Sequence, residues 1–157
     1  MAYSITTKEL QPQPVLLVRR RVKRSEIAAA ITEALPLIFA YAQRNAIALA
    51  GHPFTRYIEQ GPGLITMEPG MLIIGARPGP SDDAQVVVDT LPGGLVATTT
   101  HAGPYETLPD AYAALQLWME AEGHAAAGAP WEYYVTDPAE HPDPKDWKTD
   151  VFWPLAR

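Results

Sequence analysis

Hydrophobic residues recur along this chain with two spacings, one typical of strands and one typical of helices. Segments with the two spacings alternate along the sequence. Residues 14–22, 53–60 and 70–77 are short runs rich in Val, Leu, Ile and aromatic residues, which is typical of strands. Between the first two runs, the spacing predicts a helix that starts at an N-cap on Ser25, runs towards Leu49 and ends at Gly51. Pro36 lies inside it, so we expect a kink or two helical pieces there.

The second half of the chain repeats this order of elements after a linker at residues 78–85. Residues 86–103 predict a strand pair or a bulged strand around the turn that Pro92, Gly93 and Gly94 form. A helix is expected from Glu106 to Glu122, closed by Gly123. Two further strands follow at residues 130–137 and 148–156, separated by the proline-rich loop 138–146.

A fixed offset of 77 residues, which carries Gly51 onto Gly128, aligns the two halves. The offset places Phe54 on Trp131, Thr55 on Glu132, Tyr57 on Tyr134, Leu35 on Tyr112 and Tyr41 on Trp118. Such self-similarity is typical of a duplicated supersecondary unit. We therefore predict an α+β fold, in which two strand-helix-strand-strand repeats related by a pseudo-twofold axis form a largely antiparallel sheet with two long helices and a central ligand cleft. The chain would be one domain over residues 1–157, with repeat one at about 12–80 and repeat two at about 86–157.

The amino-acid composition limits the classes of function that we expect for this protein. The 157 residues are 47% hydrophobic and 19% charged, which suits one globular domain. Apolar stretches are interrupted before the ~18 residues of a membrane span, and the absence of cysteine is compatible with a reducing compartment, so we expect a cytoplasmic protein without a membrane partner. The net charge of −6 argues against nucleic acid as a direct partner. A basic run, Arg19–Arg24, allows a nucleic-acid patch, but it is better explained as the outer end of a strand leading into a helix.

The candidate site centres on Glu132, a carboxylate between aromatic residues in a predicted strand. Period 2 places Glu132 and Tyr134 on one face of that strand, and Tyr57 occupies the equivalent face in the first half. Duplicated aromatic residues around one unduplicated acid are typical of a ligand pocket, in which a cation would compensate the acid and contact aromatic faces. The residues assigned to ligand binding are Glu132, Tyr134, Tyr57, Tyr41, Trp118 and Trp153. The alternative is that Glu132 faces solvent and the rings belong to the core.

Other chemistry has little support in the sequence. The four histidines are scattered without a metal-ligand spacing, so no metal is expected. A phosphate-binding loop and a nucleophile elbow are both missing, and no cofactor is expected. His101, near Tyr105 and Glu106, is interpreted as part of the turn into the second helix.

These motifs, taken together, resemble the GyrI-like small-molecule-binding family, the effector-binding domain of AraC-type and MerR-type transcription regulators. The residues that carry the resemblance are "GHPFTRYIE", "VVVDTLPGGLVATTTHAG", "HAGPYETLPDAYAALQLWMEAEG", "GAPWEYYVTDP" and "TDVFWPL", within residues 12–156. The resemblance implies two strand-helix-strand-strand modules around a cleft for lipophilic, often cationic, aromatic compounds. The acidic residue of the family's E-x-Y motif falls on Glu132, with Tyr134 as its tyrosine. About a dozen residues precede the domain, so the regulators' DNA-binding region is missing from this sequence.

Three functions are compatible with this resemblance. The first is binding of lipophilic, cationic aromatic molecules for sensing, sequestration or detoxification. The second is hydrolysis of cyclopropane-containing alkylating natural products, in which Glu132 would activate water and Tyr134 would stabilise the developing phenolate. The third is a protein-interaction module like the gyrase-inhibiting members, with an unidentified protein partner. The sequence leaves open whether the protein is an enzyme.

Overall fold

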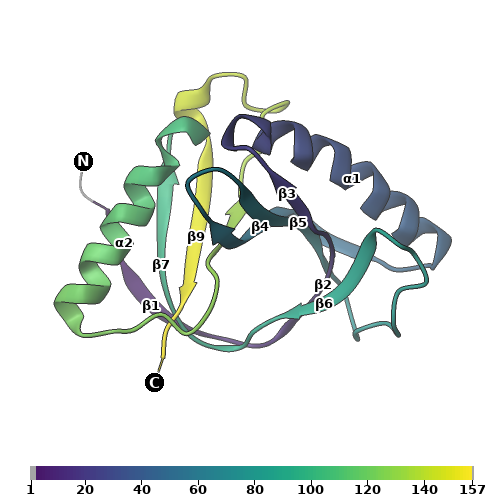
Figure 1. Cartoon of the computed structure of the whole chain (residues 1–157), viewed down its shortest axis with the longest axis horizontal. Coiled ribbons are helices and arrows are strands. Elements are labelled where there is room, and N and C mark those ends of the chain that lie inside the picture. The colour runs from purple at the N-terminus through teal and green to yellow at the C-terminus, as the bar shows by residue number, and fades with distance from the viewer. Residues whose placement is uncertain (1–2, 157) are drawn as a thin grey trace. The chain divides into compact units, whose positions relative to one another are not determined.

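The computed structural model describes residues 3–156 and shows an α+β fold of antiparallel strands and two long helices, as predicted. The chain divides into two compact units, which we name after their helices. The α1 unit is Pro12–Pro92, and the α2 unit combines Met1–Gln11 with Gly93–Arg157. The order of elements in both units can be followed in Figure 1.

The α1 unit contains one helix and five strands. Its strands have the order β4-β5-β2-β6, with β3 also paired to β5. The bounds are β2 Gln13–Val18, β3 Arg20–Val22, η1 Arg24–Glu26, α1 Ile27–Arg44, β4 Leu49–Gln60, β5 Ile65–Ile73 and β6 Val86–Leu91. Val15–Val18 reads as a continuous apolar run because all four side chains are buried, and Leu16 and Val18 pack with Ala34 and Ile38 of α1.

Helix α1 differs from the prediction at both ends and in the middle. It begins at Ile27 behind the short helix η1, so its N-cap is Glu26 and not Ser25. It ends at Arg44, and Gly51 lies inside β4 with a left-handed φ of 66°. Pro36 is exposed within one uninterrupted helix, so the alternative of two helical pieces is wrong, and the alternative of a kink stays a prediction. By length and a mean hydropathy of 1.3, Arg24–Arg44 also fits a membrane span, but its buried stripe packs on the strands of its own unit.

Strand β5 is longer than predicted and begins at Ile65, ahead of the predicted start at residue 70. Gly70 stands opposite Phe54 of β4 and Leu17 of β2. A Cβ atom on Gly70 would clash with the carbonyl oxygen of Leu16 and lie 2.8 Å from Cζ of the Phe54 ring. Glycine at this position therefore allows the Phe54 ring to lie directly against the backbone of β5.

The α2 unit has the same core topology. Its strands follow the order β1-β7-β9-β8 and its helix packs on β7 and β9 (Figure 1). The bounds are β1 Thr6–Leu10, β7 Gly94–Ala102, η2 Tyr105–Thr107, α2 Leu108–Glu122, β8 Trp131–Tyr134, η3 Pro144–Asp146 and β9 Lys148–Pro154. Leu108, Ala111 and Leu115 of α2 pack on Ala97 and Val151. Pro109 lies in the first turn of α2, and Gly123 ends the helix, as predicted, with a φ of 74°.

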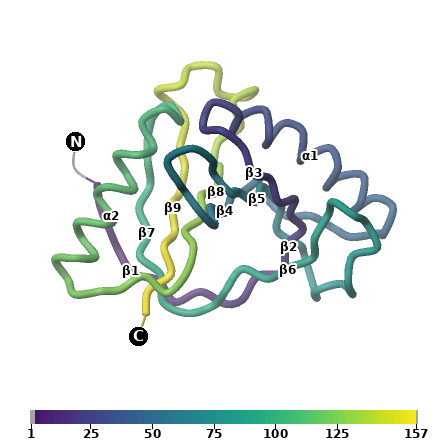
Figure 2. The backbone as a smooth tube through the Cα atoms, viewed as in Figure 1, coloured from purple at the N-terminus to yellow at the C-terminus, as the bar shows by residue number. Residues whose placement is uncertain are grey.

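We call β1 and β6 the leading strands, because they directly precede β2 and β7 in the sequence. Each leading strand pairs within the unit other than that of the strand it precedes, so the two units exchange these strands. Strand β1 directly precedes β2 in the sequence but pairs with β7, whereas β6 directly precedes β7 but pairs with β2. Figure 2 allows β1 to be followed beside β7, and β6 beside β2. The predicted turn at Pro92–Gly94 therefore joins two strands that do not pair with each other, and residues 86–91 belong to the α1 unit.

Candidate functional site

Glu132 is a buried carboxyl group held by two tyrosine hydroxyls. Its side chain projects from β8, and the residue is 4% exposed. Oε2 accepts a hydrogen bond of 2.8 Å from Tyr134, two positions further along the same strand. Oε1 accepts one of 2.9 Å from Tyr112 of α2. The two oxygens are thus fixed by one donor from β8 and one from α2.

The protonation of Glu132 reflects this environment. Burial raises the pKa of the Glu132 carboxyl from 4.5 to about 7, because the charged form loses its hydration. The hydroxyls of Tyr134 and Tyr112 act in the opposite direction, since they donate to the carboxylate. Within residues 3–156, no arginine, lysine or histidine lies within ion-pair distance of Glu132. The carboxyl is therefore polarised by hydrogen bonds but has no counter-charge from the described side chains.

A second buried glutamate shows what a structural acid looks like in this protein. Glu68 of β5 is fully buried, and its Oε1 accepts a 2.7 Å bond from Nε of Arg56. Its Oε2 accepts from Nε of Arg19 at 2.9 Å and from Nη2 of the same arginine. Arg56 also pairs with Asp89 at 2.7 Å. Glu68 therefore lies in a compensated ion network, in contrast to Glu132.

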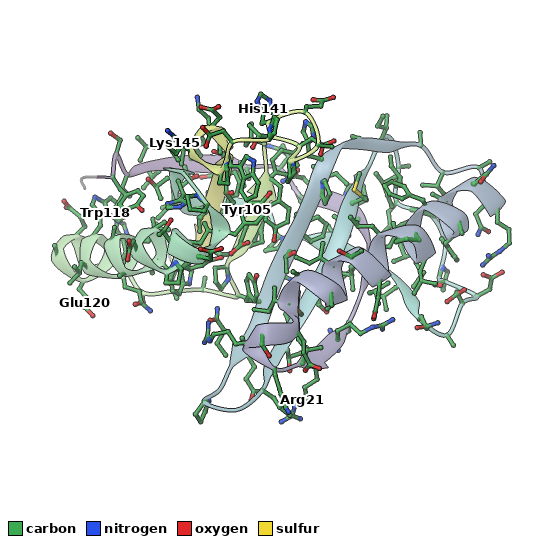
Figure 3. The ribbon with its side chains drawn as sticks, turned by 90° about the horizontal axis from the view of Figure 1, so that it is seen from above. Arg21, Tyr105, Trp118, Glu120, His141 and Lys145 are labelled. Atoms are coloured by element: carbon green, nitrogen blue, oxygen red, sulfur yellow. The ribbon has the colours of Figure 1, made fainter. Side chains whose placement is uncertain are left out.

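A series of aromatic rings lies between Glu132 with its two tyrosines and residues 135–147, which we call loop 135–147. The ring of Tyr105 lies 5.5 Å from that of Tyr134 and 4.7 Å from that of Trp147. Trp147 fixes the loop by donating from Nε1 to the carbonyl oxygen of His141 at 2.6 Å. Figure 3 shows Tyr105 on the inner side of this loop, which carries His141 and Lys145 on its outer side. Burial, then the charges of Glu132 and Asp137, raise the pKa of Tyr105.

Two further groups border Glu132 and its tyrosines. The Tyr112 ring makes an edge contact with Trp153 of β9 at 6.0 Å between centroids. Thr149 of β9 stands directly opposite Tyr134 and is fully buried. Its hydroxyl has no hydrogen-bond partner among the described residues. An unsatisfied buried hydroxyl costs about 1–3 kcal/mol, so the site retains polar capacity that the protein itself does not use.

The predicted site residues fall into three groups. Glu132 and Tyr134 bond to each other, and Trp153 joins them through Tyr112. Trp118 lies further along α2, where it stacks on His124 at 5.3 Å and packs against the same buried cluster as Tyr112 and Trp153. Tyr41 and Tyr57 belong to the α1 unit, where they lie in two separate clusters and are 3% and 8% exposed. The assignment of all six residues to a ligand site stays a prediction.

Sequence reasoning missed Tyr112, although a signal for it was present. In the repeat, Glu132 stands where the first half has Thr55, and Tyr112 stands where it has Leu35, so one position changes from a hydroxyl to a carboxyl and the other gains a hydroxyl. The structure joins these two replacements by a hydrogen bond. A tyrosine ring fits the apolar stripe of a helix, so helical periodicity does not show that the hydroxyl of Tyr112 reaches a carboxyl group.

His101 is hydrogen-bonded to groups around the turn into α2. His101 is buried, with Nδ1 bonded to the Tyr3 hydroxyl at 2.9 Å and Nε2 within 2.9 Å of the Thr107 hydroxyl and 3.1 Å of the carbonyl oxygen of Pro104. It thus shapes the turn into α2, as the sequence indicated. Over residues 3–156, no group of three or more potential ligands is placed to hold a metal ion.

Comparison with known proteins links this architecture to a family. The model of the GyrI-like small molecule binding domain matches residues 1–156. The EcmrR C-terminal domain has a similar structure, with a TM-score of 0.84 and 22% identity over 100% of this chain and 99% of that chain. SAV2435, solved bound to tetraphenylphosphonium, gives a TM-score of 0.66 at 12% identity over 99% and 94% of the two chains.

A hydrolase from Listeria innocua gives a TM-score of 0.64 at 14% identity, over 97% of this chain and 91% of that chain. No curated protein matches the sequence. At these identities the structural matches establish the fold, whereas the family model covers nearly the whole sequence. The chain therefore belongs to the family of GyrI-like small-molecule-binding domains.

Proposed function

We propose that this protein binds lipophilic, cationic aromatic molecules beside Glu132, as a cytoplasmic sensor or sequestering protein that does not contact nucleic acid directly. The observation that carries the proposal is the burial of Glu132 without a counter-charge from the described side chains. A buried anion of this kind is costly unless a cation or a proton compensates it. Glu68, which is equally buried, already has two arginines and offers no such opportunity.

The surrounding groups suit an aromatic cation. Tyr134, Tyr105 and Trp147 provide π faces near the acid, and a cation over such a face gains about 0.5–2 kcal/mol. Tetraphenylphosphonium, the ligand in the SAV2435 structure, has one positive charge and four phenyl rings, so it combines both requirements. Burial of its rings would supply most of the remaining affinity.

Titration of tetraphenylphosphonium by calorimetry tests this proposal. Replacing Glu132 by Gln keeps the shape and removes the charge, so the affinity should fall at least tenfold at pH 8. Glu120→Gln is the matched control, because Glu120 is exposed on α2 (Figure 3) and its loss should leave the affinity unchanged. Equal affinities of the wild type and Glu132→Gln would refute Glu132 as the anchor.

A second candidate function is hydrolysis of strained cyclopropane compounds. The pKa of Glu132, raised to about 7, suits a general base at neutral pH. Glu132 would take a proton from water, whose oxygen attacks a cyclopropane carbon, while the broken C–C bond leaves its electron pair on a phenolate that accepts a hydrogen bond from a tyrosine. The similar fold of the Listeria innocua hydrolase is compatible with this chemistry.

Mass spectrometry separates this candidate from passive binding. Incubation with a cyclopropane-containing alkylator should yield the water adduct with the wild type and at least a hundredfold more slowly with Glu132→Gln. If product forms at the rate seen in buffer alone, the protein is a binder and not a hydrolase.

A further inference from the structure

We propose that Glu132 holds a proton while the site is unliganded and releases it when a cation binds, and that Tyr112 is the positioning residue that tunes this exchange. The inference rests on the proposed function and concerns the same site. It adds a dependence on pH that follows from how the carboxyl is surrounded.

The carboxyl group of Glu132 has no positive charge beside it among the described side chains. Glu132 is 4% exposed, and its bonding partners are the neutral hydroxyls of Tyr112 and Tyr134. Two phenols can donate to a carboxylate, but they bring no positive charge. A buried carboxyl group avoids an uncompensated charge if it holds a proton while the site is unliganded and contacts a cation when the ligand is bound.

Among residues 3–11 and 93–156 of the α2 unit, no side chain forms an ion pair with Glu132. The titratable groups facing Glu132 are Tyr134 from β8, Tyr112 from α2 and Tyr105 from η2, with the negative charge of Asp137 nearby. From β9, the same face carries Thr149 and Val151, which do not titrate. His101 on β7 has both ring nitrogens bonded elsewhere.

The exchange is balanced in atoms and charge. The proton on the carboxyl passes to buffer, the carboxylate keeps its two phenol donors, and the cation supplies the positive charge that the proton removed. Burial raises the pKa of Glu132 to about 7, which supports a proton on the unliganded site near neutral pH. Because the cation binds the ionised form, affinity should fall as pH decreases through this value and level off above it.

Tyr112 can be distinguished from a merely structural tyrosine by this profile. Its hydroxyl donates to Oε1 and lowers the pKa of Glu132. Tyr112→Phe removes that donor, so the midpoint of the pH profile should move to higher pH. A structural role alone would weaken binding by the same factor at every pH. Tyr3→Phe is the matched control, since its hydroxyl bonds to His101 and not to Glu132.

The experiment is calorimetric titration with tetraphenylphosphonium at pH 6, 7 and 8.5, in buffers of different ionisation enthalpy, which gives the number of protons released per cation bound. For the wild type we expect nearly one proton at pH 6 and almost none at pH 8.5, with affinity about tenfold lower at pH 6 than at pH 8.5. Tyr112→Phe should shift both curves upward in pH, and Tyr3→Phe should leave them unchanged.

Three negative results have different meanings. Binding at pH 6 without proton release would overturn the exchange while leaving the proposed function intact. An unshifted profile in a folded Tyr112→Phe variant would overturn the role of Tyr112. Absence of binding at every pH would overturn both the exchange and the proposed function. Glu132→Gln gives an internal check, because any cation it still binds should release no proton.

Discussion

Glu132 stabilises the folded protein only while it is protonated. Its folded pKa of about 7 lies above the ordinary value of 4.5, so the folded state binds more protons than the unfolded state between these two values. The contribution is therefore fully present below the unfolded pKa and is lost as pH rises through the folded pKa. An ionised Glu132 therefore lowers the free energy of unfolding.

Urea denaturation at pH 5 and pH 8.5 measures this cost. Between these pH values, the wild type should lose about 2–3 kcal/mol more of its free energy of unfolding than Glu132→Gln does, because Gln cannot titrate. The difference between the two proteins cancels the titration of all other groups. Parallel stability profiles would show that Glu132 titrates in the folded protein as it does in the unfolded chain.

At single positions, the sequence identified the acid but not its environment. The repeat singled out Glu132 because a threonine occupies the equivalent position, and period 2 placed Tyr134 beside it. The hydrogen bond from Tyr112 was not predicted, because helical periodicity reports which face a residue occupies but not which atoms its side chain reaches. Distances between elements depend on packing that a single sequence does not encode locally.

Among the elements, β5 depends on the missing side chain at Gly70. Gly70→Ala would push a Cβ atom into the backbone of β2 and the Phe54 ring, neither of which can move freely in the interior of the sheet. We expect a loss of about 3 kcal/mol or more in the free energy of unfolding, the upper end of the cost of overpacking.

Thermal denaturation followed by circular dichroism checks this expectation. Gly63→Ala is the control, because Gly63 lies in the β4–β5 connection and a Cβ atom there meets nothing within 4 Å. Its melting temperature should change little. A Gly70→Ala variant as stable as the control would show that β2 and β4 separate more easily than their pairing indicates.

Element types were predictable, whereas their bounds and partners were less so. Period 2 and period 3.6 identified the main strands and both helices, and Gly123 marked the end of α2. Pro36 suggested a break that tertiary packing overrides, since Ala34, Ile38 and Tyr41 anchor α1 on both sides of it. The turn at Pro92–Gly94 suggested a hairpin, but the strands on either side of it have partners elsewhere in the sequence.

For the molecule as a whole, the exchange of leading strands ties the two units together through the covalent chain. Strand β1 is paired along its full length with residues 94–98 of β7, although the sequence directly after β1 enters the α1 unit. The unit that holds Glu132 therefore depends on the first ten residues, which lie far from it in sequence.

Deleting residues 1–10 tests this dependence by hydrogen exchange. Removal of β1 leaves the outer edge of β7 unpaired and also removes the Tyr3 hydroxyl from His101. We expect amides of β7 and α2 to exchange at least tenfold faster, while amides of β2 and β5, whose partners remain, keep their protection.

Uniformly faster hydrogen exchange in both units would instead mean that the two units unfold as one cooperative body. The pairing of β1 with β7 would then affect the stability of both units. Tetraphenylphosphonium would then protect β2 and β5 as strongly as β7, because a ligand that stabilises one unit would stabilise the whole chain.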